Sequence, residues 1–147
     1  MLPFRIYFRC FLSELPVFII CKFQRVQKMG SSPSKVPVVP GACNGNVALC
    51  SRPWSEVSQI GTHNSAFVGA IPTANQDWTV TQQLDAGIRF LQAQSHWENN
   101  ALRMCHTNCL LFDAGPATDY LSTIRKWMET NPNEVVCITY SAIVESR

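Results

Sequence analysis

Hydrophobic and polar positions after residue 53 follow two alternating patterns. Short apolar runs at 57–63, 88–94 and 135–140 predict three strands, and the last run suits a strand that is buried on both faces in a parallel sheet. Stretches with helical spacing of apolar residues separate these runs. Strand, helix, strand, helix, strand is the order of an α/β fold, so we expect a parallel sheet with helices packed on it.

Two helices are predicted between the strands. The first spans 79–86, because Thr79 and Gln82 have the spacing of a capping box and Gly87 suits a left-handed stop. The second ends at Pro132, and its apolar residues recur three or four positions apart. These residues are Ala117, Tyr120, Leu121, Ile124, Trp127 and Met128. They line one face of the helix, so we interpret its aromatic members as packing residues rather than as a ligand site.

Residues 1–35 differ in charge from the rest of the chain. They carry six basic side chains and a single acidic one, Glu14, whereas the remaining residues are net negative. An apolar run behind two arginines has the form of a secretory leader, but Glu14 and Pro16 interrupt it, and it is too short for a membrane-spanning helix of about 20 residues. We expect residues 1–39 to be a leader or a disordered extension with a linker, and residues 40–147 to form the domain.

The composition is that of one modest globular domain. The chain has 147 residues, of which 46% are hydrophobic and 15% charged, and a formal net charge of +2. Because the charge is near neutral and the sequence has no block of five like charges, we expect no nucleic-acid partner. A complete (β/α)₈ barrel takes about 250 residues, so this chain is too short to form one.

Seven cysteines are many for a chain of this length. Four of them lie in close pairs, Cys43 with Cys50 and Cys105 with Cys109. A zinc site with His106 as an extra ligand is one interpretation, but the six-residue gap in the first pair does not match the C-x₂₋₄-C spacing of zinc ligands. Two local disulfides fit better, and they indicate a secreted or extracytoplasmic protein. The other cysteines are Cys137, expected to be a buried thiol, and Cys10 and Cys21 in the N-terminal segment.

Two histidines lie where α/β folds build their sites. His63 ends the first predicted strand, and His106 lies in a loop beyond the second. Loops at the carboxyl ends of parallel strands converge, and two imidazoles there can divide the roles of base and acid, since the ordinary histidine pKa is about 6.5. Spacing alone favours the simpler interpretation that both are polar loop residues. A third histidine, His96, is expected in a solvated turn.

Three motifs favour a catalytic role for His63 and His106 over a role as polar loop residues. They are Gly61-Thr62-His63-Asn64-Ser65, Gln83-Leu84-Asp85-Ala86-Gly87-Ile88-Arg89-Phe90-Leu91 and Cys105-His106-Thr107. In this order and spacing they resemble the X region of phosphatidylinositol-specific phospholipase C, and most of all its extracytoplasmic, cysteine-containing branch in fungi. The resemblance covers roughly residues 43–145 and implies a partial TIM-type (β/α) barrel, with about the first three strands of eight. Such an N-terminal fragment has open sheet edges, and we expect it to be poorly active alone.

The resemblance also implies a reaction, the cleavage of a phosphodiester in a lipid head group. His63 corresponds to the general base that takes a proton from the inositol 2-hydroxyl, and His106 to the acid that protonates the leaving glycerol oxygen. The attacking hydroxyl belongs to the substrate, so the first product is a cyclic phosphodiester. The expected partner is therefore a phospholipid or an inositol-phosphate-type molecule, with peripheral membrane contact.

The chain departs from the family at its charged positions. Calcium-dependent members combine the asparagine after the first histidine with acidic residues of the second strand, and here Asn64 is the only candidate calcium ligand because Gln92 and Gln94 are neutral. Metal-free members place an arginine at the position of Gln94. We therefore expect no cofactor, and we treat these three residues as candidates for substrate or phosphate binding. Arg89 should point to the opposite sheet face, and Arg103 has no family counterpart.

Two functions follow from this comparison. In the first, the chain is the catalytic front part of a secreted phospholipase C-like phosphodiesterase, a phosphoric diester hydrolase that uses the histidine pair. In the second, it is a catalytically attenuated secreted protein that binds a polyol phosphate or a cell-surface glycolipid through the same rim, since neutral dipoles stand where relatives carry charge. A glycerophosphodiesterase is disfavoured, because those enzymes carry His-Arg-Gly where this chain has His63-Asn64-Ser65.

Overall fold

The computed structural model describes residues 8–9, 18–19, 22–23 and 34–143. Most of the expected leader, including Cys10 and Cys21, lies outside these residues. No helix in the described part of the chain is long and apolar enough to cross a membrane. The continuous described segment is 34–143, and it contains both helices and the longest strands.

Eight strands, two α-helices and two short 3₁₀ helices make up the described structure. In chain order they are β1 (Phe8–Arg9), β2 (Phe18–Ile19), β3 (Lys22–Phe23), η1 (Val47–Leu49), η2 (Trp54–Glu56), β4 (Ile60–Thr62), α1 (Val80–Asp85), β5 (Phe90–Glu98), β6 (Ala101–Cys105), β7 (Asp113–Pro116), α2 (Ala117–Glu129) and β8 (Cys137–Ile143).

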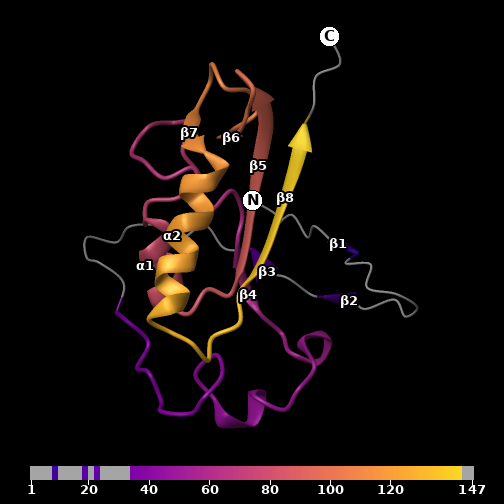
Figure 1. The fold of residues 1–147 in the computed structure, drawn as a ribbon, viewed down its shortest axis with the longest axis vertical. Coiled ribbons are helices and arrows are strands. Elements are labelled where there is room, and N and C mark those ends of the chain that lie inside the picture. The colour runs from indigo at the N-terminus through magenta and orange to yellow at the C-terminus, as the bar shows by residue number, and fades with distance from the viewer. Residues whose placement is uncertain (1–7, 10–17, 20–21, 24–33, 144–147) are drawn as a thin grey trace.

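Strand β5 is the centre of the main sheet (Figure 1). It pairs in parallel with β4 through its first residues and with β8 along most of its length, and its far end pairs antiparallel with β6. Strand β7 continues the sheet beyond β6, and β3 pairs in parallel with β4. The predicted parallel order of three strands is therefore confirmed in β4, β5 and β8, and the α/β class with it.

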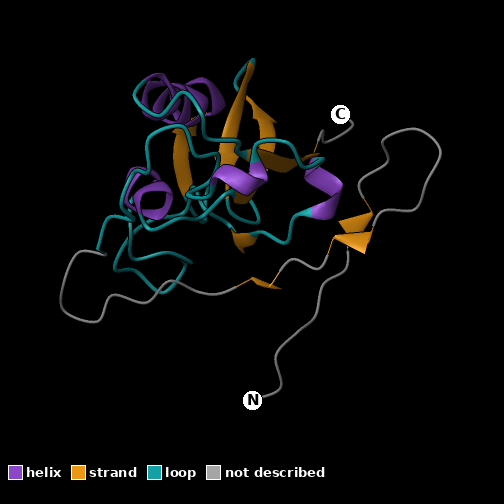
Figure 2. Cartoon of the chain, turned by 90° about the horizontal axis from the view of Figure 1, so that it is seen from below, coloured by secondary structure: helices purple, strands orange, loops and turns teal. Residues whose placement is uncertain are grey.

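The hydrophobic core lies between the sheet and the two helices, which cover the same side of it (Figures 1 and 2). Its buried residues are Phe67, Val80, Leu84, Ile88, Leu91, Ala93, Met104, Ala117, Tyr120, Ile124 and Trp127. Side chains alternate between the two faces of a strand, so Gln92 and Gln94 lie on the face opposite Leu91 and Ala93. This polar second face is where the site is built.

Both predicted helices are present. Thr79 caps α1 as expected: its hydroxyl accepts from the Gln82 N–H at 3.3 Å, and the Gln82 side chain accepts from the Thr79 N–H at 2.9 Å. Gly87 adopts a left-handed φ of +91° after the helix. Helix α2 ends at Glu129, before the predicted Pro132, and its aromatic residues Tyr120 and Trp127 are buried packing residues as expected.

The hairpin of β5 and β6 was not predicted, and the expectation for His96 was wrong. Strand β5 continues past the predicted end at residue 94 to Glu98, turns through Asn99 and Asn100, and returns as β6. Both asparagines have positive φ, 51° and 59°, which a two-residue hairpin turn requires. His96 therefore lies within a paired strand and is buried, with 6% of its surface exposed, rather than in a solvated turn.

The other strand boundaries shift by a few residues, and the described sheet does not close. Strand β4 spans only three residues of the predicted run at 57–63, and β8 begins two residues after the predicted start at residue 135. The sheet is mixed and open within the described residues, so the α/β class is confirmed but a partial barrel is not. Cys137, expected to be buried, is half-buried at the start of β8.

Both predicted disulfides are present. Cys43 is bonded to Cys50 in the loop around η1, and Cys105 is bonded to Cys109 directly after β6. Asn44 fastens the first loop to the entry of β8, since its side chain accepts from the Val135 N–H at 2.8 Å and donates to the Val135 carbonyl at 3.2 Å. The interpretation of these four cysteines as zinc ligands is therefore wrong.

Candidate active site at the ends of strands β4 and β6

The two predicted catalytic histidines come from different loops. His63 directly follows β4, and His106 directly follows β6. Gly61 allows β4 to lie close to β5, because a Cβ atom at this position would come within 2.9 Å of the Phe90 ring. The strand pairing therefore brings the His63 loop over the middle of β5, next to Gln92.

The pKa of His63 reports its surroundings. Burial of the half-buried ring lowers the pKa from the ordinary value of 6.5, a hydrogen bond to the Gln92 side chain raises it, and the charge of His106 lowers it. The first cause is the largest, and the net direction is down. Because the charge of His106 acts on the His63 ring, the two imidazoles share one electrostatic environment.

The ring of His106 is held in one orientation. Its Nδ1 lies 2.8 Å from the Thr73 carbonyl oxygen, and since a carbonyl only accepts, Nδ1 carries the proton of this hydrogen bond. The ring also stacks on Phe67, with centroids 5.1 Å apart and planes inclined by 26°. These contacts leave Nε2 as the nitrogen that can exchange a proton with a bound molecule.

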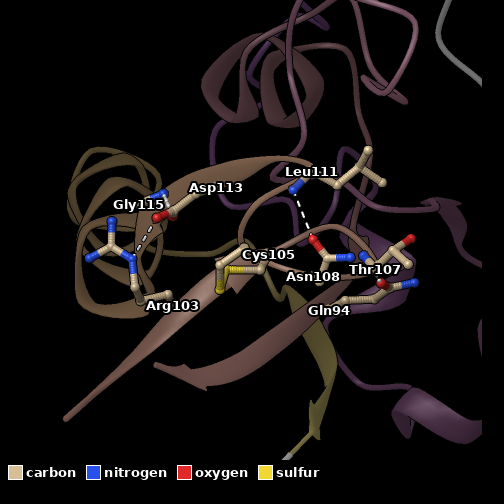
Figure 3. The surroundings of a disulfide bond; sticks show 9 residues. Gln94, Arg103, Cys105, Thr107, Asn108, Leu111, Asp113 and Gly115 are labelled. Carbon is tan, nitrogen blue, oxygen red and sulfur yellow. Dashed lines mark hydrogen bonds and ion pairs between the residues drawn. A yellow bond between two sulfur atoms is a disulfide. The ribbon is translucent and has the colours of Figure 1, made fainter. Parts of the chain in front are cut away.

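The disulfide from Cys105 to Cys109 (Figure 3) closes a short loop, and His106 is the first residue of this loop after Cys105. Within it Thr107 adopts a left-handed φ of 66°, which is unusual for a β-branched residue. The Thr107 N–H donates to Gln94 Oε1 at 2.9 Å, and the His106 N–H donates to the Phe112 carbonyl at 2.9 Å. The covalent closure and these hydrogen bonds together fix the backbone on both sides of the histidine.

Asn64, Gln92 and Gln94 are brought close to the histidines, but their polar atoms are largely engaged. Asn64 is fully buried, its N–H donates to Gln92 Oε1 at 2.9 Å and its side chain donates to Asn75 at 3.1 Å. Its buried Oδ1 accepts no hydrogen bond from the described residues. The Gln92 Nε2 donates to the Ala93 carbonyl at 2.9 Å. Gln94 is half-buried, and its Nε2 has no hydrogen bond to the described residues. Of the three, Gln94 keeps a donor for a bound anion.

These oxygen atoms do not fit a calcium ion. Calcium takes six to eight oxygen ligands, with carboxylates among them. Here the Gln92 and Gln94 oxygens already accept hydrogen bonds from Asn64 and Thr107, and the Asn64 oxygen is enclosed. The described residues also hold no group of three or more histidine, cysteine or acidic side chains that could bind a metal.

Neither arginine near the motifs faces the histidine pair as a phosphate ligand. Arg89 points to the helix side, as expected, and forms a buried ion pair with Glu134 at 2.6 Å beneath the Trp127 ring. Arg103 pairs with Asp113 at 2.7 Å across β6 and β7 (Figure 3). Both guanidinium groups are committed to structural ion pairs.

Gln83 is a site residue that our sequence analysis did not single out. This fully buried residue of α1 accepts from the Thr62 hydroxyl at 2.8 Å and donates to the carbonyls of Ser65 and Trp78 at 3.0 and 2.8 Å. It therefore holds the chain on both sides of His63. A signal was present, because a polar residue sits on the buried face of α1 with Val80 and Leu84.

Replacing Gln83 with methionine is expected to lower the free energy of unfolding by about 1–3 kcal/mol, because it leaves the buried Ser65 carbonyl and the partly buried Trp78 carbonyl without this donor. Urea unfolding followed by tryptophan fluorescence measures the change. Thr81→Ala on the exposed face of α1 is the control and should stay within about 0.5 kcal/mol of the original chain. Equal stabilities of the Gln83→Met chain and the original would contradict the assigned hydrogen bonds.

A second buried connection joins the His63 loop to α2. Ser65 Oγ donates to the Gln92 carbonyl at 3.1 Å, so the Tyr120 hydroxyl, 2.7 Å from Ser65 Oγ, is the donor in their hydrogen bond. Burial raises the pKa of Tyr120 to about 12, which keeps this hydroxyl protonated. Ser65 therefore connects the His63 loop by hydrogen bonds to α1, α2 and β5.

Comparison with known proteins agrees with these features. The family model described as PI-PLC X matches residues 49–144. A PI-PLC X domain-containing protein of Arthroderma benhamiae is 50% identical over 97 residues, covering 65% of this chain. An uncharacterized secreted protein of the same fungus is 40% identical over 98 residues, again 65% of this chain. A PI-PLC X domain-containing protein of Arabidopsis thaliana is 32% identical over 100 residues, or 58% of this chain.

The matched regions are parts of longer relatives. They cover 32%, 22% and 23% of the three proteins, so the chain spans between about a fifth and a third of their lengths. No solved structure matches the chain. The family match extends over more than half of the chain and includes both histidine loops and the strand between them. The chain therefore belongs to the PI-PLC X domain family.

Proposed function

We propose that the chain carries the histidine pair of a phosphodiesterase that cleaves a phospholipid or inositol-phosphate-type head group. The observation that carries the proposal is that two neighbouring positions on one face of β5 hold the loops of both histidines: Gln92 accepts the N–H of the residue after His63, and Gln94 accepts the N–H of the residue after His106. His63 is the general base: it takes the proton of a substrate hydroxyl as that oxygen bonds to phosphorus. His106 is the general acid: Nε2 protonates the leaving oxygen as its bond to phosphorus breaks.

The surroundings suit this division of roles. The lowered pKa of His63 keeps its ring neutral near pH 7, as a base requires. The Thr73 carbonyl accepts a hydrogen bond from Nδ1–H of His106 and so leaves Nε2 as the nitrogen that would donate a proton to the leaving oxygen. The half-buried Gln94 offers Nε2 as a donor to a phosphoryl oxygen. The products are a cyclic phosphodiester and an alcohol, and no step requires calcium.

A second candidate is binding with little turnover, and a specific observation favours it. Charge that faces the phosphoryl oxygens is usually a large part of catalysis in phosphoryl transfer. Gln92 and Gln94 supply dipoles, and the guanidinium groups of Arg89 and Arg103 are paired elsewhere. In this alternative, the chain recognises a polyol phosphate or a cell-surface glycolipid through the same residues.

We also propose that the protein is secreted and meets its ligand at a membrane surface. Two disulfides are stable in an oxidising compartment, and one relative is named a secreted protein. A phospholipid substrate places the reaction at a membrane surface, which the chain would contact peripherally.

The test is product analysis under single-turnover conditions. Excess 147-residue chain is incubated with phosphatidylinositol, or with a glycosylated inositol lipid, in detergent micelles with and without a calcium chelator, and the products are followed by phosphorus NMR. A cyclic phosphate formed equally with and without chelator supports the phosphodiesterase. Saturable binding of the micelles without product supports the second candidate. Product that disappears with chelator contradicts the calcium-free mechanism.

Activity is expected to persist below pH 6.5. His63 must be neutral to act as base, and its pKa is lowered from 6.5, so the acidic limb of the profile of kcat/KM against pH lies below that value. The free energy of unfolding should also decrease as the pH falls. Between the lowered pKa of His63 in the folded state and the ordinary value of 6.5 in the unfolded state, the folded state binds fewer protons, so the contribution of His63 to stability is lost as the pH falls through this interval. An acidic limb above pH 6.5 would argue against His63 as the base.

A further inference from the structure

The two glutamines of β5 make equivalent contacts with the two histidine loops. Gln92 Oε1 accepts the N–H of Asn64, and Gln94 Oε1 accepts the N–H of Thr107, both at 2.9 Å. Asn64 directly follows His63, and Thr107 directly follows His106. Each glutamine therefore holds the first residue after one histidine.

The residues that are held share an unusual backbone conformation. Asn64 has a φ of 53° and Thr107 a φ of 66°, both in the left-handed region that non-glycine residues rarely adopt. Such conformations persist where surrounding contacts enforce them. In both turns one enforcing contact is a side-chain oxygen of the central strand, and at Thr107 the Cys105–Cys109 disulfide is another. The turn held in this way sets the direction of the preceding histidine.

The glutamines are themselves fixed. They lie two positions apart in β5, so they project from the same face of one strand. Gln92 is buried, its Nε2 donates to the Ala93 carbonyl at 2.9 Å, and it also hydrogen-bonds the His63 ring.

We propose that Gln92 and Gln94 are positioning residues for the reaction, each orienting one histidine through the backbone N–H that follows it. This inference rests on the proposed function for its catalytic meaning, but the hydrogen bonds can be tested without activity. Neutral amide side chains can accept both backbone N–H groups without a bound cation. Two carboxylates this close on one strand would repel each other unless a cation lay between them, whereas two carboxamide oxygens accept the same N–H groups without a counterion.

Four variants separate positioning from direct phosphate binding. Gln92→Met and Gln94→Met remove the acceptor and keep the length of the side chain. Gln92→Glu and Gln94→Glu keep an oxygen acceptor but remove the amide donor. If the glutamines position the histidines, the glutamate variants keep the backbone N–H protected from exchange, whereas the methionine variants lose this protection.

Hydrogen exchange measured by NMR reads each hydrogen bond directly. In Gln94→Met the Thr107 amide should exchange about tenfold faster while that of Asn64 is unchanged, and Gln92→Met should give the reverse result. Each variant is thus the control for the other. If both amides exchanged faster to the same extent in either variant, the substitution would have destabilised the whole domain, and the assignment of each glutamine to one amide would fail. Unchanged exchange in both variants would also overturn the proposal.

Kinetics and titration complete the test. Under the proposal the methionine variants lower kcat more than they raise KM, since they disorient catalytic groups rather than weaken binding. The Gln92→Glu variant should raise the pKa of His63, because a carboxylate replaces the neutral amide at its ring. If the original chain forms no product, the proposed function fails, but the exchange pattern still decides the positioning. If a methionine variant does not fold, a scalar coupling between Thr107 ¹⁵N and Gln94 ¹³Cδ in the original chain decides it, and absence of that coupling overturns the assignment.

Discussion

Replacing His63 or His106 with alanine is expected to lower the rate of cyclic phosphate formation by about 10²–10⁴-fold, the usual contribution of a general acid or base. His63 would no longer take the proton of the attacking hydroxyl, and His106 would no longer protonate the leaving oxygen. The measurement is the single-turnover rate on phosphatidylinositol in micelles. The unfolding free energy should change little, because both rings are partly exposed.

The double variant and a control histidine sharpen this prediction. Residues that act as one unit are not additive, so His63→Ala combined with His106→Ala should be slowed much less than the product of the two single effects. His96→Asn is the matched control, because this third histidine lies in β5 outside the pair and its buried Nε2 makes no hydrogen bond to the described residues. Loss of activity in His96→Asn equal to that in His63→Ala would contradict the assignment of the pair.

Replacing Arg89 with methionine is expected to destabilise the domain by about 3–5 kcal/mol, since it leaves the carboxylate of Glu134 buried without its partner. The two side chains are 8% and 12% exposed, and the Nε to Oε2 distance is 2.6 Å. The guanidinium also donates to the carbonyls of Leu84 and Ile88, which connects the end of α1 to the start of β5. Urea denaturation with a fixed slope measures the change.

An exposed ion pair provides the control for Arg89. Arg125 pairs with Glu129 one helical turn away at 3.0 Å, and these side chains are 81% and 58% exposed. Such pairs contribute about 0.3–0.5 kcal/mol, so Arg125→Met should barely move the unfolding midpoint. If Arg89→Met destabilised the chain no more than Arg125→Met does, the buried pair would not be the structural connection described here.

The local patterns of the sequence predicted much of the fold. The capping box at Thr79, the spacing of apolar residues in α2 and the β-branched run of β8 are all short-range signals, and each element is present. The hairpin of β5 and β6 was missed because His96 and the mostly polar residues after it indicate a solvated turn, whereas only the Asn99–Asn100 pair forms the turn itself. Its strand pairing is a tertiary effect that overrides the local pattern.

The site was predictable in its residues but not in its contacts. Motif spacing located His63 and His106, and the alternation of β5 placed Gln92 and Gln94 on one face, opposite Arg89. The sequence could not show that the two glutamine oxygens accept hydrogen bonds from the backbone N–H groups of Asn64 and Thr107, which lie 28 and 13 residues away along the chain. Nor could it show the three hydrogen bonds of Gln83, because such contacts depend on how loops fold over the sheet.

The most direct measurement is the pKa of His63 by NMR titration, in the original chain and in His106→Asn. Burial and the charge of His106 both lower this pKa, so removing that charge should raise it, while burial keeps it below 6.5. A pKa of His63 that is the same in both chains would contradict the account, because the two imidazoles would then not share one site.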